Sequence, residues 1–275
     1  MRLLRLLFQG IVALSMSLGA AAQAAPTFDR IVVLGDSLSD NGNAGRFSNG
    51  PVWVEVLAGR LNVPLSPSSE GGSNYAVGGA QLDPASGPHS LRAQADLLLS
   101  KPAPSGRTLS IVWGGANDLF AAASQPDPAT KLRASVASLR SVVADLVEHG
   151  ATDILVLNLP DVGLAPAVQV HGRRAADVAR LLTDRFNKET ERVLAEIEAS
   201  ASRSLRLTRL DVHALADQVR KDPSAFGFVN ISVPCSGRAS CDGYLFWDEV
   251  HPTSFAHRRL AERALQLLGA GEAAQ

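Results

Sequence analysis

Short hydrophobic runs alternate along the chain with longer stretches in which apolar residues recur every three or four positions. The runs have the length of buried strands, and the spacing in the longer stretches is typical of amphipathic helices. This alternation indicates an α/β fold with a parallel sheet. The expected helices cover residues 129–148 and 175–198, and a last helix runs from near Thr253 to about residue 268. The expected strands lie at residues 30–34, around 73–77, and at 108–113, 153–158 and 205–210.

The first 24 residues have the three parts of a secretory signal. Arg2 and Arg5 come first, an apolar run follows to about Leu18, and the small-residue triplet AQA ends the segment at Ala24. A membrane anchor is the alternative, but the apolar run is interrupted by polar residues and is shorter than the roughly 20 residues that a span needs. We therefore expect cleavage after Ala24, a secreted or periplasmic protein, and no integral membrane segment in the mature chain.

Residues 25–275 contain no repeat and no linker rich in Gly, Pro or Ser, so we expect a single domain. The chain is 46% hydrophobic and 19% charged, as in an ordinary globular protein with a large core. Its formal net charge is −1, and loss of the two arginines of the signal would make it more acidic. A nucleic-acid partner would require a basic surface, so we expect none, and we expect a monomer.

Ser37 stands where the first hydrophobic run changes into a polar loop, in the sequence RIVVLGDSLSDNGNAG (30–45). Open α/β sheets place their ligands at the carboxyl ends of parallel strands. Two further runs, SNYAVGGAQ (73–81) and IVWGGANDLF (111–120), also end in glycines and a polar group. One crevice at this sheet edge is therefore expected to hold all three segments.

Asp248 and His251 are three residues apart in LFWDEVHPTSFAH (245–257), just before the last expected helix. A turn of this length brings a carboxylate and an imidazole into contact, and the carboxylate then fixes the ring that accepts a serine proton. Acyl transfer also needs donors aimed at the oxyanion. The candidate donors are the backbone N–H of Ser37, the backbone N–H of Gly79 and the side-chain amide of Asn117.

Four blocks, GDSLSDNGN, NYAVGGA, GGANDL and FWDEVHPT, together resemble the SGNH or GDSL-type serine hydrolases and stand in that family's order. The resemblance extends over nearly the whole mature chain. It is greatest to the branch of secreted bacterial lipase/esterases, lecithinase-like enzymes and plant GDSL lipases. It implies that Ser37 is the nucleophile, that His251 and Asp248 complete the triad, and that Ser37, Gly79 and Asn117 form the oxyanion hole.

The family also implies a fold and a function. The fold is a three-layer α/β/α sandwich with a mainly parallel five-stranded sheet, flavodoxin-like in order. The function is a secreted carboxylic-ester hydrolase that works through a serine acyl-enzyme and needs no cofactor. An acyltransferase that passes the acyl group to an alcohol or sterol would use the same triad. A catalytically silent exported binding module would keep only the fold.

Two cysteines, Cys235 and Cys241, lie in one loop of a chain predicted to be exported. We interpret them as a disulfide, with two buried free thiols as the alternative. Gly78 competes with Gly79 as the oxyanion donor, and Asp118 is expected to hold a turn.

The remaining aromatic and histidine residues are given structural interpretations. Trp53 is expected in the core rather than in a substrate pocket. His257, beside Arg258 and Arg259, is expected on a solvated face of the last helix. The histidines show no metal-ligand spacing, so no metal site is predicted.

Overall fold

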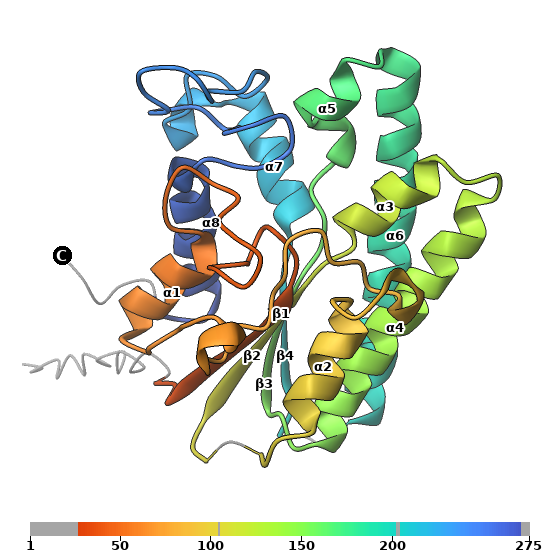
Figure 1. Cartoon of the computed structure of the whole chain (residues 1–275), viewed down its shortest axis with the longest axis vertical. Coiled ribbons are helices and arrows are strands. Elements are labelled where there is room, and N and C mark those ends of the chain that lie inside the picture. Colours follow the sequence, from red (N-terminus) through yellow and green to blue (C-terminus); the bar gives the residue numbers. More distant parts are fainter. Residues whose placement is uncertain (1–26, 104, 202–203, 271–275) are drawn as a thin grey trace, which may run out of the picture.

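Four parallel strands lie side by side at the centre of the molecule (Figure 1). The computed structural model describes residues 27–270 except 104, 202 and 203, so the predicted signal, residues 1–24, lies outside the described residues. In the described part the strand order is β1-β2-β3-β4. The strands are β1 (Arg30–Gly35), β2 (Thr108–Trp113), β3 (Asp153–Leu157) and β4 (Arg206–Leu210).

The central strands are buried on both faces. Every residue of β3 is buried, and β1 and β2 are buried except at their first residues. A parallel strand covered by helices on both sides needs such a continuous apolar run. Burial on both faces accounts for these three strands, whereas β4, at the end of the strand order, is buried at Leu207 and Leu210 alone.

The predicted fifth strand, residues 73–77, lies beside β1 but is not a regular strand. Three backbone hydrogen bonds of 2.8 to 3.1 Å join it to β1. Its pairing with β1 amounts to an isolated parallel bridge between Val33 and Asn74, while the backbone N–H and carbonyl of Asn74 face away from β1 and bond to Ser66 and Ser68. The sheet therefore has four strands rather than five, although this segment occupies the place of a fifth and preserves the flavodoxin-like order.

Helices cover both faces of the sheet, as the predicted three-layer fold requires (Figure 1). On one face α1 (Trp53–Leu61) packs against α8 (Ser254–Leu267), and α7 (Val212–Lys221) follows β4. The other face carries α2 (Leu91–Leu99), α4 (Pro128–Glu148) and α6 (Arg173–Ser200). The loops contain α3 (Ala116–Ala123), α5 (Pro166–Gln169) and the short 3-10 helices η1 (Ser68–Glu70), η2 (Pro84–Ser86), η3 (Val162–Leu164) and η4 (Ser224–Phe226). Among the described helices, none combines the length and apolar character of a bilayer span.

Side-chain caps fix where the predicted helices begin. Asp127 accepts the N–H groups of Ala129 and Thr130 at the start of α4. The hydroxyl of Thr253 accepts the N–H of Ala256 at the start of α8. Such caps satisfy N–H groups that have no partner inside the helix. The cap at Thr253 therefore starts α8 directly after the segment that holds Asp248 and His251.

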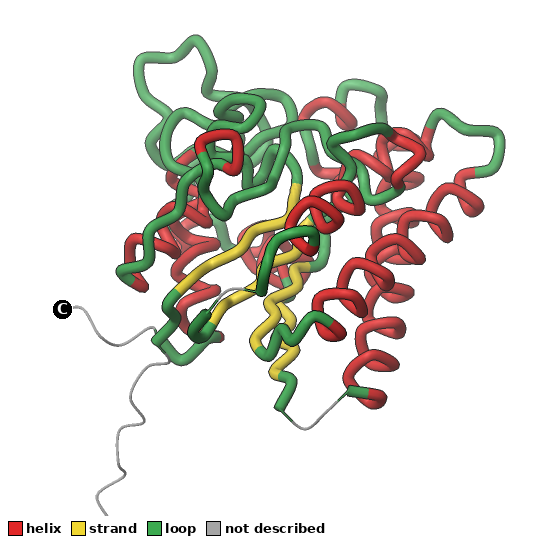
Figure 2. The backbone as a smooth tube through the Cα atoms, turned by 60° about the horizontal axis from the view of Figure 1, so that its bottom comes forward, coloured by secondary structure: helices red, strands yellow, loops and turns green. Residues whose placement is uncertain are grey.

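Long loops gather beyond the carboxyl ends of the strands (Figure 2). The main hydrophobic core fills the space between the sheet and its helices. A second, smaller cluster lies under the loop that follows α7. Its buried members are Val219, Phe228 and Ala256, with Phe226, Ile231, Leu245 and Phe255 packed against them. We call this group the loop cluster.

Candidate active site

Ser37 follows β1 directly, in a tight turn at the carboxyl edge of the sheet. The carbonyl of Asp36 accepts the N–H groups of Ser39 and Asp40, each at 3.0 Å, and the Asp36 carboxyl accepts the N–H of Leu38 at 3.0 Å. These bonds fix the loop that presents the serine. Ser37 is 7% exposed, and it lines a cavity.

The structure brings Ser37, His251 and Asp248 into one chain of contacts. The Oγ atom of Ser37 lies 2.9 Å from Nε2 of His251. The other ring nitrogen, Nδ1, lies 2.8 Å from Oδ2 and 3.0 Å from Oδ1 of Asp248. A hydroxyl, an imidazole and a carboxylate are thus within hydrogen-bond reach of one another, which is the arrangement that serine catalysis requires.

The turn around Asp248 keeps its carboxylate charged. Burial alone would raise the pKa of Asp248, but the hydrogen bonds from the backbone N–H and ring of His251 and from the N–H of Val250 hold that pKa below its ordinary value. The two backbone bonds are 2.6 and 2.8 Å long. The N–H of Trp247 also donates to the carbonyl of His251 at 2.8 Å. An ionised carboxylate is therefore fixed against the imidazole.

The turn after residues 73–77 distinguishes the two candidate glycines. The N–H of Gly78 donates to Oδ2 of Asp40 at 2.8 Å, so this donor is already occupied. Gly79 has φ +77° in a turn closed by the bond from the N–H of Ala80 to the carbonyl of Val77. This left-handed conformation favours glycine. Among the described residues, no hydrogen bond partner occupies the N–H of Gly79, which leaves it the better oxyanion donor of the two.

Asn117 is tied to the same turn. Its Nδ2 atom donates to the carbonyl of Ala80 at 3.0 Å, and an amide group has a second hydrogen to offer. Gly115 precedes α3 with φ +119°, and a Cβ there would lie 2.5 Å from the ring of Phe186. Only glycine fits, and it allows α3 to begin close to the sheet edge. Asn117 lines the same cavity as Ser37.

Two polar residues of the first motif support the site in a way that sequence reasoning missed. The carboxylate of Asp40 accepts the N–H groups of Gly42 and Asn43 as well as that of Gly78. The side chain of Asn43 donates to the carbonyls of Asn74 and Ala76, each at 2.8 Å. These bonds join the loop that carries Ser37 to the turn that contains Gly78 and Gly79. Asp40 and Asn43 both belong to the polar sequence DNGN (40–43) that follows the serine, so this sequence could have indicated their supporting role.

Phe47 packs against His251, a contact that the sequence patterns did not predict. Its ring centroid lies 5.2 Å from that of His251. A Cβ at Gly78 would approach the same ring to 2.2 Å, so the phenyl group fills the space between this glycine and the imidazole. No motif signalled this contact, because the three residues come from separate parts of the chain.

Asp36, next to Ser37 in sequence, and Asp118, next to Asn117, carry buried carboxyl groups. Burial raises the pKa of Asp36 to about 7, with a further contribution from the charge of Asp118 and an opposing one from the N–H of Leu38. Burial also raises the pKa of Asp118, although hydrogen bonds from Ser135 and Leu82 oppose the shift. Because Asp118 accepts the N–H of Leu82 at 2.9 Å, it holds the segment after Gly79, in line with its predicted role.

Trp53 lies in the core, as predicted, and is fully buried. Its indole N–H donates to Oγ of Ser39 at 3.0 Å, so it also supports the loop that carries Ser37. Among the described residues there is no group of three or more His, Cys, Asp or Glu side chains placed to hold a metal ion.

His257 is not on a solvated face, so that prediction is wrong. The side chain is 1% exposed because position 257 shares the inner face of α8 with Leu260 and Ala264. Neither ring nitrogen has a hydrogen-bond partner among the described residues. Burial lowers the pKa of His257 to about 3, with smaller contributions from His251 and Arg46. The solvated position was predicted from Arg258 and Arg259, which follow His257 in sequence but point to other sides of the helix.

The buried imidazole of His257 is expected to make the protein less stable in acid. Below pH 6.5 the unfolded chain binds a proton at this histidine and the folded chain does not, so the free energy of unfolding falls as the pH falls. The contribution is about 2 to 3 kcal/mol between pH 6.5 and about pH 4.5. Urea unfolding gives the free energy of unfolding of wild type and of His257→Leu at both pH values. The contribution of His257 is the change, between the two pH values, in the difference between these two free energies.

Replacement of the exposed His171 by leucine is the matched control, and its stability difference from wild type should stay the same at both pH values. An equally constant difference for His257→Leu would show that His257 does not titrate in this way.

The predicted disulfide between Cys235 and Cys241 is present. The N–H of Cys235 donates to the carbonyl of Phe246 at 3.0 Å, and the N–H of Ser236 donates to the carbonyl of Trp247 at 2.8 Å. The bridged loop is therefore bonded to the two residues that precede Asp248.

Replacing both cysteines by serine is expected to lower the free energy of unfolding by about 2 kcal/mol, because the unfolded chain then gains the freedom of the short loop. Activity should fall as well, since the segment before Asp248 loses its support. Chemical denaturation and ester hydrolysis of the double variant test both statements. A double variant as stable as wild type would contradict the first statement.

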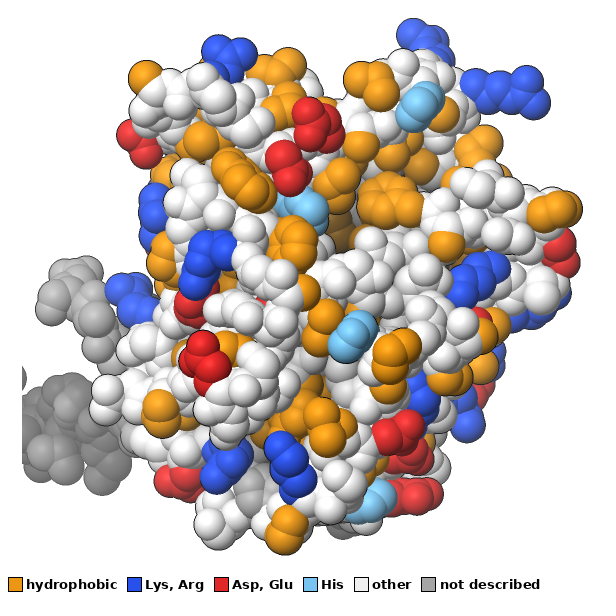
Figure 3. All heavy atoms as spheres, viewed as in Figure 1, with side chains coloured by type: hydrophobic (Ala, Val, Ile, Leu, Met, Phe, Trp, Pro, Cys, Tyr) orange, Lys and Arg blue, Asp and Glu red, His pale blue; other side chains and the backbone are white. Residues whose placement is uncertain are grey.

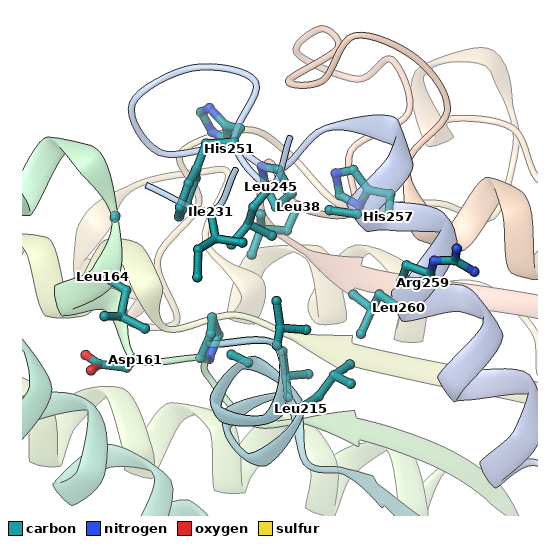
Figure 4. Close-up of a pocket in the computed structure, with 18 of the residues that line it drawn as sticks. Leu38, Asp161, Leu164, Leu215, Ile231, Leu245, His251, His257, Arg259 and Leu260 are labelled. Carbon is teal, nitrogen blue, oxygen red and sulfur yellow. The ribbon is translucent and has the colours of Figure 1, made fainter. Parts of the chain in front are cut away.

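A cavity of about 660 Å³ opens beside Ser37, Asn117 and His251. In Figure 3 hydrophobic side chains surround a hollow in the upper half of the molecule, between the α7 and α5 regions. Figure 4 shows that His251 lies at one end of the cavity and Leu215 of α7 at the other. The volume is within the range of about 300–1,000 Å³ that is usual for small-molecule sites.

Known proteins with similar sequences include a hemolysin and an acyltransferase. A thermolabile hemolysin of Vibrio parahaemolyticus is 28% identical over 90% of this chain and 65% of its own length. A phosphatidylcholine-sterol acyltransferase of Aeromonas hydrophila is 25% identical over 93% of both chains. The chain thus spans a little less than two thirds of the hemolysin.

The fold has solved counterparts. The acetylxylan esterase Axe2 of Geobacillus stearothermophilus superposes with a TM-score of 0.55 over 90% of this chain and 97% of its own, at 20% identity. At this identity the likeness concerns the fold alone. The family model described as GDSL-like Lipase/Acylhydrolase matches residues 31–264, which include all of the candidate site residues. The chain therefore belongs to the GDSL-like lipase/acylhydrolase family of carboxylic-ester hydrolases.

Proposed function

We propose that the protein hydrolyses carboxylic esters through an acyl-enzyme on Ser37, with His251 as the general base and Asp248 as its orienting group. The observation that carries this proposal is the continuous set of contacts from Ser37 Oγ through the imidazole to the Asp248 carboxylate. An ionised Asp248 favours the tautomer in which Nδ1 carries the hydrogen, so Nε2 faces the serine as an acceptor.

In the first half-reaction Oγ of Ser37 attacks the ester carbonyl carbon while its proton moves to Nε2 of His251. The carbonyl oxygen becomes an oxyanion, and the N–H groups of Ser37 and Gly79 and the amide of Asn117 are its proposed donors. Removal of one such donor typically costs about 10²–10³ in turnover. When the intermediate collapses, the bond to the alcohol oxygen breaks and His251 gives its proton to the departing alcohol.

In the second half-reaction water attacks the acyl carbon and gives a proton to His251. The bond between the acyl carbon and Oγ then breaks, the proton returns to Oγ, and the carboxylic acid leaves. The enzyme is regenerated, and the net reaction consumes one water per ester.

A fluorophosphonate probe tests the proposed nucleophile directly. We expect a single adduct on Ser37 by peptide mass spectrometry, and we expect the adduct to block hydrolysis of p-nitrophenyl esters. Heat-denatured protein is the control, because an unactivated serine reacts slowly. An adduct on a different serine, or full activity in the labelled protein, would contradict the assignment.

Acyl transfer to an alcohol or sterol is a second candidate. It is supported by the similarity to the phosphatidylcholine-sterol acyltransferase, which extends over 93% of both chains. The acyl-enzyme would be the same, and an alcohol would replace water in the second step. Product analysis with and without added sterol separates the two reactions, since only transfer produces a sterol ester.

Export from the cytoplasm is part of the same proposal. The bridge between Cys235 and Cys241 supports it, because disulfides persist mainly in oxidising compartments. The secreted or periplasmic location would then follow from the signal predicted at residues 1–24.

A further inference from the structure

The cavity beside Ser37 lies between two hydrophobic cores. The main core supports it from the side of the sheet, and the loop cluster covers it from the side of the α7–α8 loops. α7 and α8 form its two walls, and Figure 4 shows Leu215 and Leu260 projecting from them. Members of both cores therefore line the cavity.

Large apolar side chains around the cavity are only partly buried. Exposed apolar surface in a cavity is stabilised when another apolar group covers it. Six of these side chains are Leu38, Leu164, Leu215, Phe226, Ile231 and Leu245. They come from five separate segments of the chain, so the apolar lining surrounds the cavity instead of following a single helix.

Charged side chains that line the cavity are largely engaged with other protein groups. Arg259 pairs with Glu262 at 2.9 Å, and Asp161 pairs with Arg180 at 2.7 Å. The sugar part of a substrate would need several free polar groups to replace its bonds with water. An apolar chain needs none, and it would cover the half-buried side chains.

We propose that this cavity binds the acyl chain of the substrate, and that the protein prefers esters of medium-chain and long-chain fatty acids to acetate esters. The inference rests on the proposed function of Ser37 and names the substrate class of that site. An acetyl group would leave most of the roughly 660 Å³ unfilled.

The chemistry assigns the cavity to the acyl group rather than to the alcohol. The acyl group stays bonded to Ser37 between the two half-reactions, so it suits an apolar cavity directly beside the serine. The alcohol leaves first, and water must then reach the acyl carbon from the side that the alcohol has left. The leaving-group side therefore needs access to solvent.

The test measures kcat/KM for p-nitrophenyl acetate, butyrate, octanoate and dodecanoate at concentrations where each ester is monomeric. Each buried methylene raises kcat/KM by up to about fourfold. We expect octanoate to exceed acetate by at least about 100-fold. Equal or higher values for acetate would overturn the proposal.

Two variants locate the effect in the cavity. Leu215→Trp and Ala216→Leu add volume to the wall formed by α7, and both should lower the ratio of dodecanoate to acetate kcat/KM by about tenfold or more. The matched control is Leu181→Trp, at an exposed leucine of α6 outside the cavity, which should leave the ratio as it is in wild type. An unchanged ratio in both cavity variants would overturn the proposal.

A second series of acetate esters, in which the alcohol is lengthened from methyl to octyl, tests whether the cavity binds the alcohol part of the substrate instead. If Leu215→Trp acts on this series and not on the acyl series, the cavity binds the alcohol and the inference is wrong. Failure of the proposed function gives a different result, because no ester of either series would then be hydrolysed at Ser37 and the fluorophosphonate would not label it.

Discussion

Ser37→Ala is expected to lower kcat for ester hydrolysis by about 10⁴- to 10⁶-fold. The variant lacks the oxygen that would form the proposed acyl-enzyme, and removal of the nucleophile in a comparable triad costs about 2 × 10⁶ in kcat. The remaining rate would come from the oxyanion donors and from substrate binding. Steady-state hydrolysis of p-nitrophenyl octanoate measures the loss, and thermal unfolding checks that the variant is folded.

The control for Ser37→Ala is Ser86→Ala. Ser86 is an exposed serine in η2, and its hydroxyl donates to the nearby carbonyl of Asp83. This variant should keep wild-type kcat. A folded Ser37→Ala protein that retained more than about 1% of wild-type kcat would remove Ser37 from the role of nucleophile.

The hydrophobic pattern was sufficient to predict most of the sheet and the long helices. Continuous apolar runs such as that of β3 occur because both faces of the strand are covered, and this requirement is visible in the sequence. The cap at Thr253 likewise marks the start of α8 locally. The segment at 73–77 was predicted as a strand, but it pairs with β1 through an isolated bridge between Val33 and Asn74, and no local pattern distinguishes such a bridge from a regular strand.

His257 shows how a neighbouring charge can mislead. Position 257 is one helical turn after the cap at Thr253 and lies in phase with Leu260 and Ala264, so its burial follows from helix geometry. Arg258 lies beside it in sequence but on a different side of the helix. The phase of the whole helix was therefore a better guide than the residues next to the histidine.

The residue types and their order were sufficient to nominate the candidate site, but contacts between distant segments decide its details. Asp40 occupies the N–H of Gly78 across 38 residues, which favours Gly79 as the donor. Phe47 reaches His251 from the opposite end of the chain. The cavity has walls from α7, α8 and several loops, and its apolar lining appears only when these segments are folded together.

The dependence of ester hydrolysis on pH provides the second test of the proposed triad, through Asp248 and His251. His251 must be neutral to accept the serine proton, so wild-type activity should rise from acidic pH to a plateau. Asp248 stays ionised throughout this rise, because its pKa lies below the usual value of 3.8. Asp36, whose pKa burial raises to about 7, is a second group in the site that ionises near neutral pH. A parallel profile of Asp36→Asn therefore separates its contribution from that of His251.

Asp248→Asn is expected to lower kcat by about 10⁴-fold, and the loss should persist on the plateau where His251 is neutral. The asparagine oxygen can still accept the N–H groups of Val250 and His251, so the turn should remain folded. The amide can also donate to the ring, which stabilises the tautomer with its hydrogen on Nε2 and removes the acceptor for Ser37; the same change in a comparable triad costs about 10⁴. Glu249→Gln, at the exposed acid next in the chain, is the control and should match wild type. If Asp248→Asn came within tenfold of wild type on the plateau, the carboxylate would not be the group that orients His251.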